Sequence, residues 1–133
     1  MRWRIIKPTT WTNEKSRVLQ FSSHNFDSYF ADTLSMLMAG GCMCIPPEES
    51  RLVGLAGVVA SMEVTSMFMT PTIAHILKPS EVPTLKVLIL GGESAVQEVV
   101  DLWADHVTLV NTYGPAECCC DAVCHNFTTG DRD

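Results

Sequence analysis

The sequence has few basic residues and no cluster of them. Nine Lys and Arg residues stand against fifteen Asp and Glu residues in a chain of 133, so the formal net charge is -6 at pH 7. Proteins that bind nucleic acid or an anionic membrane surface carry a concentrated positive patch. The scattered basic residues of this chain therefore argue against both kinds of partner.

Long apolar runs are also missing. The longest apolar stretch, near residues 54–62, falls well short of the roughly 18 residues that a transmembrane helix needs. Two arginines lie within the first four residues, but the apolar segment of a signal peptide does not follow them. We expect a soluble, cytoplasmic protein.

The six cysteines lack the spacings of a metal site. Cys42 and Cys44 alternate along an expected strand, and the other four lie within residues 118–124. No C-x-x-C pair occurs, and no common zinc pattern fits. Because thiols stay reduced in the cytoplasm, we interpret the cysteines as buried thiols that pack as small hydrophobic groups.

Short apolar runs and segments of helical periodicity alternate along the chain. Its hydrophobic content of 47% is typical of a globular core, and its length suits one modest domain. Five runs typical of buried strands are expected at residues 17–23, 42–45, 64–69, 86–90 and 107–111. A further turn and strand are expected within residues 118–127. The alternation predicts an α/β fold whose mainly parallel sheet is built from βαβ units.

Two helices are expected in the first half of the chain. Apolar residues at helical spacing over 30–38 predict one that ends at Gly40, where a left-handed C-cap is favoured. Acidic residues at 48 and 49 suit the start of a second helix. Its expected buried stripe is Leu52, Leu55, Ala56 and Val59.

Two more helices are expected in the second half. Thr70 and Pro71 suit the N-cap and first position of a short helix that runs to Leu77. Ser94 and Gln97 have the spacing of a capping box for the next helix. The residues expected to face inward from it are Val96, Val99, Val100 and Trp103.

A polar loop, Asn111-Thr112-Tyr113-Gly114-Pro115-Ala116-Glu117, follows the last of the five apolar runs. Open α/β sheets bind ligands at the carboxyl ends of their strands. The loop holds an aromatic ring, a Gly-Pro turn and a carboxylate, which suit stacking on a base and binding of a divalent metal beside phosphate. An incidental turn would explain the Gly-Pro pair alone, but not seven such residues in order.

The segment 111–117 resembles the N-x-Y-G-P-T-E motif of adenylate-forming enzymes, particularly the amino-acid adenylation domains of nonribosomal peptide synthetases. Phe26-Asp27-Ser28 is similar to the family's F-D-x-S segment. Leu88-Ile89-Leu90-Gly91-Gly92-Glu93 is similar to the strand and turn beneath the adenine. The sequence of residues 39–42, Ala-Gly-Gly-Cys, resembles that of fungal members of the family. The resemblance implies a partial adenylation domain over 17–128, a piece of the family's large N-terminal domain, with a loose lead at 1–16 and a polar tail at 129–133.

The resemblance also implies a pocket for an amino acid. The family's F-D-x-S aspartate, here Asp27, binds the substrate's α-ammonium, and a buried cation does need a fixed anion. Capping of the next helix is the alternative role for Asp27 or Ser28. The positions that match the family's pocket wall are Asp27, Ser28, Ala31, Phe68, Ile89, Gly91, Thr112, Cys120 and Asp121. Ordinary core packing is the alternative for most of them, Ile89 and Ala31 above all.

For ATP, the resemblance implies that Gly92 and Tyr113 enclose the adenine, with Asn111 at its polar edge and Gly114 in the turn beside it. We attribute Gly92 to the close approach of a ring to the backbone. Glu117 would hold Mg²⁺ that bridges the phosphates. Ala116 stands where the family has a threonine whose hydroxyl meets the α-phosphate.

The sequence does not contain the family's phosphate loop, its ribose-binding aspartate or its C-terminal catalytic lysine. The first hypothesis is therefore a fragment, inactive alone, of a ligase that passes an aminoacyl adenylate to a phosphopantetheine thiol on a carrier domain. The second is a fragment of an acyl- or aryl-CoA ligase, which Asp27 argues against. The third is a non-catalytic remnant or binding module. We also expect marginal stability, with the apolar faces of 18–21 and 86–90 left open.

Overall fold

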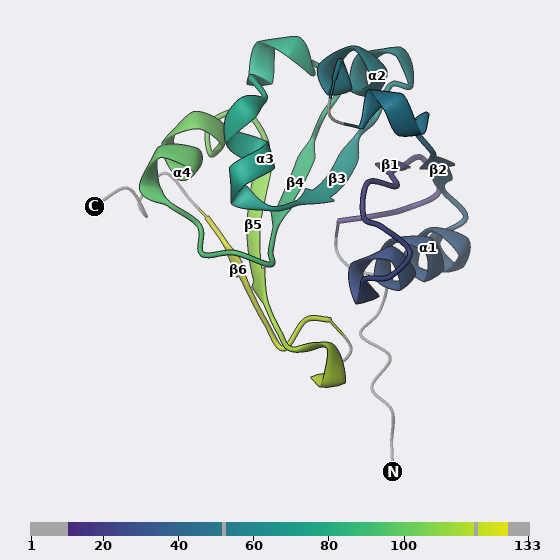
Figure 1. Ribbon diagram of the computed structural model, residues 1–133, viewed down its shortest axis with the longest axis vertical. Coiled ribbons are helices and arrows are strands. Elements are labelled where there is room, and N and C mark those ends of the chain that lie inside the picture. The colour runs from purple at the N-terminus through teal and green to yellow at the C-terminus, as the bar shows by residue number, and fades with distance from the viewer. Residues whose placement is uncertain (1–10, 52, 119, 128–133) are drawn as a thin grey trace.

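Five parallel strands and one antiparallel edge strand form the sheet at the centre of the molecule (Figure 1). The computed structural model describes residues 11–127 except 52 and 119. In space the strands follow the order β2-β1-β3-β4-β5-β6, and only β6 runs antiparallel to its neighbour. Their bounds are β1 Arg17–Leu19, β2 Cys42–Cys44, β3 Ser66–Met69, β4 Val87–Leu90, β5 Thr108–Tyr113 and β6 Val123–Asn126. The predicted α/β fold with a mainly parallel sheet is confirmed.

Within the described part of the chain, four α-helices and three short 3-10 helices connect the strands. They are α1 Asp27–Ala39, η1 Glu48–Ser50, α2 Leu55–Ser61, α3 Pro71–Ile76, η2 Pro79–Glu81, α4 Gln97–Trp103 and η3 Ala116–Cys118. The first helix ends as predicted, because Gly40 adopts the left-handed conformation with φ 71°. Most of the expected lead, the polar tail, Leu52 and Cys119 lie outside the described residues.

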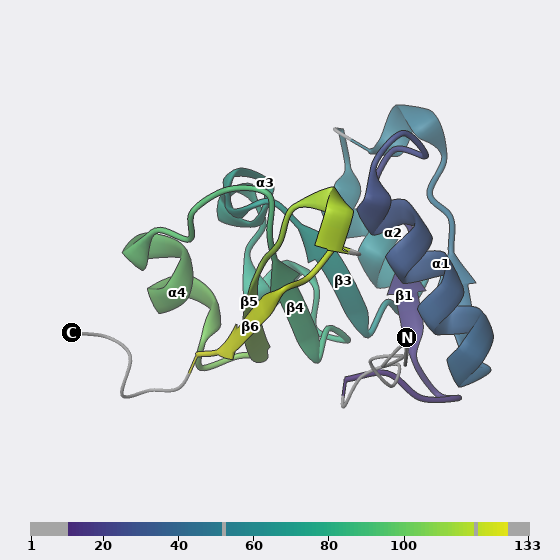
Figure 2. The same ribbon diagram turned by 90° about the horizontal axis from the view of Figure 1, so that it is seen from below.

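The strand order reverses once, between β1 and β3. The connection through α1 leaves β1 toward β2, and the next connection returns past β1 to β3. Parallel crossovers are almost always right-handed, so α1 belongs on the opposite face of the sheet from α2, α3 and α4. Figures 1 and 2 show α1 beside β1 and β2, away from α3 and α4. Such a reversal opens a crevice at the carboxyl ends of the strands.

The hydrophobic core fills one face of this sheet. Val59 of α2, Ala74 of α3 and Trp103 of α4 pack in one cluster with Leu19 and Leu88 of the strands. Trp103 is fully buried, and its indole N–H donates a hydrogen bond to the Ala74 carbonyl at 3.0 Å. No described residue of α1 belongs to this cluster. The helix α1 therefore covers the other face of the sheet, outside this core cluster.

The predicted second helix is divided in two. Gly54 has φ 84°, a conformation that only glycine adopts without strain, and it separates η1 from α2. The acidic residues at 48 and 49 therefore begin a single 3-10 turn, not the helix that carries the apolar stripe. Leu55 and Val59 are buried as expected.

The predicted capping box of α4 is wrong. The helix begins at Gln97 with Val96 in the N-cap position, so Ser94 lies outside the helix and cannot cap it. The Gln97 amide instead donates a hydrogen bond to Asp101 Oδ1 at 3.1 Å. Val96 is 46% exposed and not turned inward, whereas Val99 and Val100 are buried as expected.

Among the five cysteines that the structure describes, the interpretation as buried thiols holds only for Cys44. Cys42, Cys118 and Cys124 are exposed, and Cys120 is half-buried. The strands explain two of these exposures, because Cys42 lies on edge strand β2 and Cys124 on edge strand β6. Among the described residues, no helix combines the length and apolar content that a membrane crossing requires.

The open apolar surface lies on α1 and not where it was expected. Val18, Leu19, Leu88 and Leu90 are all buried, because neighbouring strands and the helices of the core cover them. On α1, by contrast, only Met36 is buried. The helical spacing over 30–38 presents an exposed apolar face, hereafter the α1 face, made of Phe30, Leu34, Leu37 and Met38, each 55–74% exposed.

We predict that Leu34→Lys combined with Leu37→Lys lowers self-association of the chain. The two exposed side chains are adjacent on the helix, and lysine has nearly the helix propensity of leucine, so the fold should be retained. Sedimentation velocity over a concentration series measures the effect. The control pair, Ile76→Lys with Val96→Lys, replaces exposed apolar residues on other elements and should leave association unchanged. Equal association of the α1 variant and the parent would contradict the prediction.

Candidate functional site

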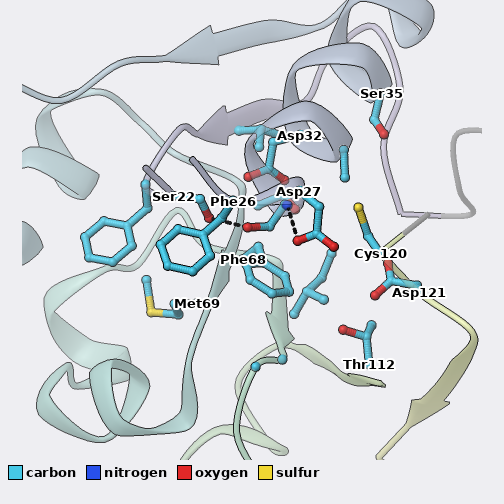
Figure 3. Close-up of a pocket in the computed structure, with 18 of the residues that line it drawn as sticks. Ser22, Phe26, Asp27, Asp32, Ser35, Phe68, Met69, Thr112, Cys120 and Asp121 are labelled. Carbon is cyan, nitrogen blue, oxygen red and sulfur yellow. Dashed lines mark hydrogen bonds between the residues drawn. The ribbon is translucent and has the colours of Figure 1, made fainter. Parts of the chain in front are cut away.

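A cavity of about 440 Å³ lies between α1 and the sheet face that it crosses, at the carboxyl ends of the parallel strands (Figure 3). Its volume is within the range of small-ligand sites. Segments that follow β1, β3, β4 and β5 contribute to its wall, together with the first turns of α1. The cavity thus occupies the crevice that the reversal of strand order creates.

All nine residues assigned to the substrate pocket line this one cavity. They come from four parts of the chain that are far apart in sequence: Asp27, Ser28, Ala31, Phe68, Ile89, Gly91, Thr112, Cys120 and Asp121. These residues were assigned from sequence motifs alone, and the structure brings all of them to the wall of one cavity. Their roles toward a substrate remain predictions.

Strand alternation explains why Phe68 and Ile89 face the cavity. They are register partners on β3 and β4, while their neighbours Met67 and Leu88 point into the core on the other face. Both cavity residues are half-buried, whereas both core residues are fully buried. Ile89 is therefore a wall residue of the cavity and not a core residue.

Gly91 keeps the cavity open. A Cβ atom at this position would lie 2.7 Å from Cε2 of Phe68 and 2.8 Å from Oγ1 of Thr112, both of which line the cavity. The Thr112 hydroxyl is itself fixed, since it donates a hydrogen bond to the Leu90 carbonyl at 3.2 Å. Any larger residue at 91 would push these walls apart.

Asp27 is the first residue of α1, and the helix-cap position belongs to Phe26. Asp27 Oδ1 accepts a hydrogen bond from the Ser28 backbone N–H at 2.8 Å, and the Ser28 hydroxyl pairs with the Ser22 hydroxyl at 2.9 Å (Figure 3). Neither Asp27 nor Ser28 occupies the helix-cap position, so the alternative role of capping is not observed for either residue. Asp27 holds its own helix start with one oxygen while its carboxylate lines the cavity.

Two further carboxylates, Asp121 and Asp32, line the same cavity. Burial raises the pKa of Asp121; the Thr112 hydroxyl opposes this rise, and the nearby Asp27 carboxylate adds to it. Burial also raises the pKa of Asp32 to about 7, with a further contribution from Asp121. Asp32 Oδ2 is buried and has no hydrogen-bond partner among the described residues. Three acids therefore influence one another around one cavity.

Asp32 was missed by the sequence reasoning. Its position four residues after Ser28 places both on the same face of α1, which is a usable signal once one of them is assigned to the cavity. Asp32 is not among the nine positions that match the family's pocket wall. Only the cavity lining identifies it as a site residue.

The residues assigned to the nucleotide divide between two places. Gly92 and Gly114 line the cavity, whereas Asn111, Tyr113 and Glu117 do not. Alternation along β5 turns Thr112 toward the cavity and Asn111 toward the opposite face. Tyr113 is 73% exposed, and Glu117 is exposed on η3.

The backbone conformation of Gly92 favours glycine. Its φ is 79°, and among protein atoms a Cβ there would meet only Cγ2 of Thr70 at an ordinary 3.6 Å. The close approach of an adenine ring to Gly92 stays a prediction. Close approach of the protein backbone selects Gly114, where a Cβ would lie 2.6 Å from the backbone N of Ala122 as the chain returns toward β6.

The Asn111 side chain is suited to an adenine edge. Its Oδ1 is buried and has no hydrogen-bond partner among the described residues, an arrangement that is costly unless a ligand donates to it. An exocyclic amino group such as that of adenine is a donor of this kind. Tyr113 follows two residues later with an exposed ring.

A cavity at the switch point of a mainly parallel sheet, beside the segment that follows β5, is the ligand-binding arrangement of open α/β proteins. The model of the AMP-binding enzyme family matches residues 1–133. The chain belongs to this family.

The chain is similar to parts of much longer proteins. It is 49% identical to Nonribosomal peptide synthetase 1 of Aspergillus fumigatus over 121 residues, which are 91% of this chain but 2% of that protein. Among solved structures it resembles the Vibrio cholerae adenylation domain AlmE in complex with glycyl-adenosine-5'-phosphate. The TM-score is 0.81 and the identity 25%, over 90% of this chain and 24% of that one.

Two other structures share the fold. One is PA1221, a synthetase protein containing adenylation and PCP domains, with a TM-score of 0.78 and 24% identity, over 95% of this chain and 23% of that one. The other is the Klebsiella oxytoca NpsA N-terminal subdomain, with a TM-score of 0.77 and 18% identity, over 89% of this chain and 32% of that one. The fold is thus that of part of the N-terminal subdomain of an adenylation domain, as predicted.

We predict that Asp32→Asn removes a loss of stability with rising pH. Because the pKa of Asp32 is about 7 in the folded chain, against 3.8 ordinarily, the folded state holds a proton that the unfolded state releases. Stability therefore falls as pH rises from about 4 to 7, by roughly 2–4 kcal/mol from this group. Urea unfolding of parent and variant at pH 5 and pH 8 measures it.

The control for this prediction is Glu98→Gln, which removes one exposed negative charge on α4. We expect Asp32→Asn to exceed the parent in stability at pH 8 and to come close to it at pH 5. If the difference in stability between the parent and Asp32→Asn is the same at pH 5 and pH 8, the raised pKa of Asp32 is contradicted.

Proposed function

We propose that this chain is part of an amino-acid adenylation domain of a nonribosomal peptide synthetase, which activates an amino acid with ATP as an aminoacyl adenylate. The observation that carries the proposal is the convergence of nine separate positions, Asp27 among them, on one cavity in a member of the AMP-binding family. The fungal synthetase relative supports the same reading.

Asp27 would bind the α-ammonium of the amino acid. The carboxylate lines the cavity, and the hydrogen bond from the Ser28 N–H fixes its position at the start of α1. The positive end of the helix dipole stabilises an ionised acid there. Acyl and aryl acids have no ammonium to neutralise, so the same residue argues against a CoA ligase for such acids.

ATP would supply the adenylyl group and a pyrophosphate leaving group. The unpartnered Asn111 Oδ1 would accept a hydrogen bond from the adenine amino group, and the exposed Tyr113 ring would stack on the base. Glu117 is exposed on η3 and has an oxygen ligand suited to Mg²⁺. Ala116 offers no hydroxyl to the α-phosphate.

A carrier-protein domain would accept the activated amino acid on a phosphopantetheine thiol. Support comes from the similar structure PA1221, which contains both an adenylation and a PCP domain. Attack of a thiolate on the mixed anhydride releases AMP and forms a thioester, so the acyl carbon is transferred without an oxidant or reductant.

We predict that Asp27→Ala abolishes amino-acid activation when residues 17–127 of this chain replace the corresponding segment of a complete adenylation domain. Loss of one partner of a buried charge pair costs about 3–5 kcal/mol, which is more than a hundredfold in rate. Amino-acid-dependent ATP–pyrophosphate exchange measures activation, and equilibrium dialysis measures ATP binding, which should be largely retained.

The control in the same domain is Glu98→Gln, which changes an exposed residue of α4 that does not line the cavity. It should keep the exchange rate of the parent. Activity of Asp27→Ala within a few-fold of the parent would show that Asp27 does not bind the α-ammonium.

A further inference from the structure

The cavity holds an excess of negative charge. Three carboxylates line it, those of Asp27, Asp32 and Asp121, and none of the described lining residues is Lys, Arg or His. If the proposed function is correct, the α-ammonium of the substrate pairs with Asp27. Asp32 and Asp121, both half-buried, then remain without a cationic partner among the described lining residues.

These two acids come from different parts of the cavity wall. Asp32 extends from α1, and Asp121 comes from the segment before β6 (Figure 3). Their coupling is visible in their acidity, because Asp121 contributes to the raised pKa of Asp32. Burying like charges this close is unfavourable unless a cation or protons neutralise them.

A metal ion is a poor candidate for that cation. Among the described residues, no three His, Cys, Asp or Glu side chains are placed to hold one metal. The cavity is also lined by Phe68, Ile89 and Ala31, which suit an aliphatic chain better than a hydrated ion. An alkyl stem that ends in an ammonium matches both halves of this lining, the apolar wall and the two acids.

We propose that the substrate is a basic amino acid whose side-chain ammonium binds between Asp32 and Asp121, with its alkyl stem against Phe68 and Ile89. This inference rests on the proposed function and adds Asp32 to the specificity-determining residues. Asp27 would thus bind the α-ammonium of the ligand, and the two further acids would bind its side-chain ammonium.

A protonated Asp32 that donates a hydrogen bond to a neutral polar side chain is the competing arrangement. It would satisfy Oδ2 of Asp32 but would leave Asp121 without a counter-charge. The two arrangements differ in what happens when the terminal ammonium of the ligand is removed at constant chain length.

Binding to the 133-residue protein is measured by NMR titration with L-lysine and L-ornithine, and with L-norleucine and L-norvaline, which have the same carbon chains without the terminal ammonium. We expect the two basic amino acids to bind at least about tenfold more tightly, since charge-assisted hydrogen bonds are the strong ones. Asp121→Asn and Asp32→Asn should each reduce this preference several-fold, and Glu98→Gln should not. Pyrophosphate exchange by the complete domain that carries residues 17–127 is compared for the same four amino acids and for the twenty common amino acids.

The outcomes separate the two proposals. Equal binding and equal exchange with all four amino acids, or a preference for the neutral pair or for serine and glutamine, would overturn the inference and leave the proposed function standing. Exchange with none of the twenty common amino acids or ornithine would overturn both. A preference for the basic pair that survives both Asp→Asn variants would show that other groups bind the ammonium.

Discussion

The right-handed crossover between parallel strands is the constraint on which this structure depends. Because β1 is followed by β2 on one side and β3 on the other, α1 and the remaining helices occupy opposite faces of the sheet. One face then carries the core around Trp103, and α1 is the described helix that spans the other. The cavity lies between α1 and this second face.

Charge gives this cavity its chemical character. Asp27 begins α1 with one oxygen held by the Ser28 N–H, and Asp32 lies five residues further along the same helix. Asp121 completes the set from a segment about ninety residues later. Burial raises the pKa of Asp32 and Asp121, because the ionised form of each carboxyl group is less stable in the folded chain than in water. Such a cost is maintained where a ligand can offset it.

Much of the fold could be predicted from local pattern, and the failures have local causes. Short apolar runs gave the strands, since a strand covered on both faces needs no polar alternation. The helix after Pro47 was predicted as one element because periodicity does not register a left-handed residue such as Gly54. Ser94 matched a capping box by spacing, yet the helix begins only at Gln97. The α1 face was correctly periodic, but periodicity does not reveal whether anything covers it.

The sequence by itself determined the family and the nine positions that line the cavity, Asp27 among them. Short motifs were sufficient for this because the order of residues in a motif can be read without knowing how the chain folds. Only the tertiary structure decided that Asp32 belongs to the site and that Asn111 and Thr112 face opposite ways from one strand. It also decided which acids interact, since burial and distance set a pKa and neither is written in the order of residues. The charge of the cavity is a property of the fold.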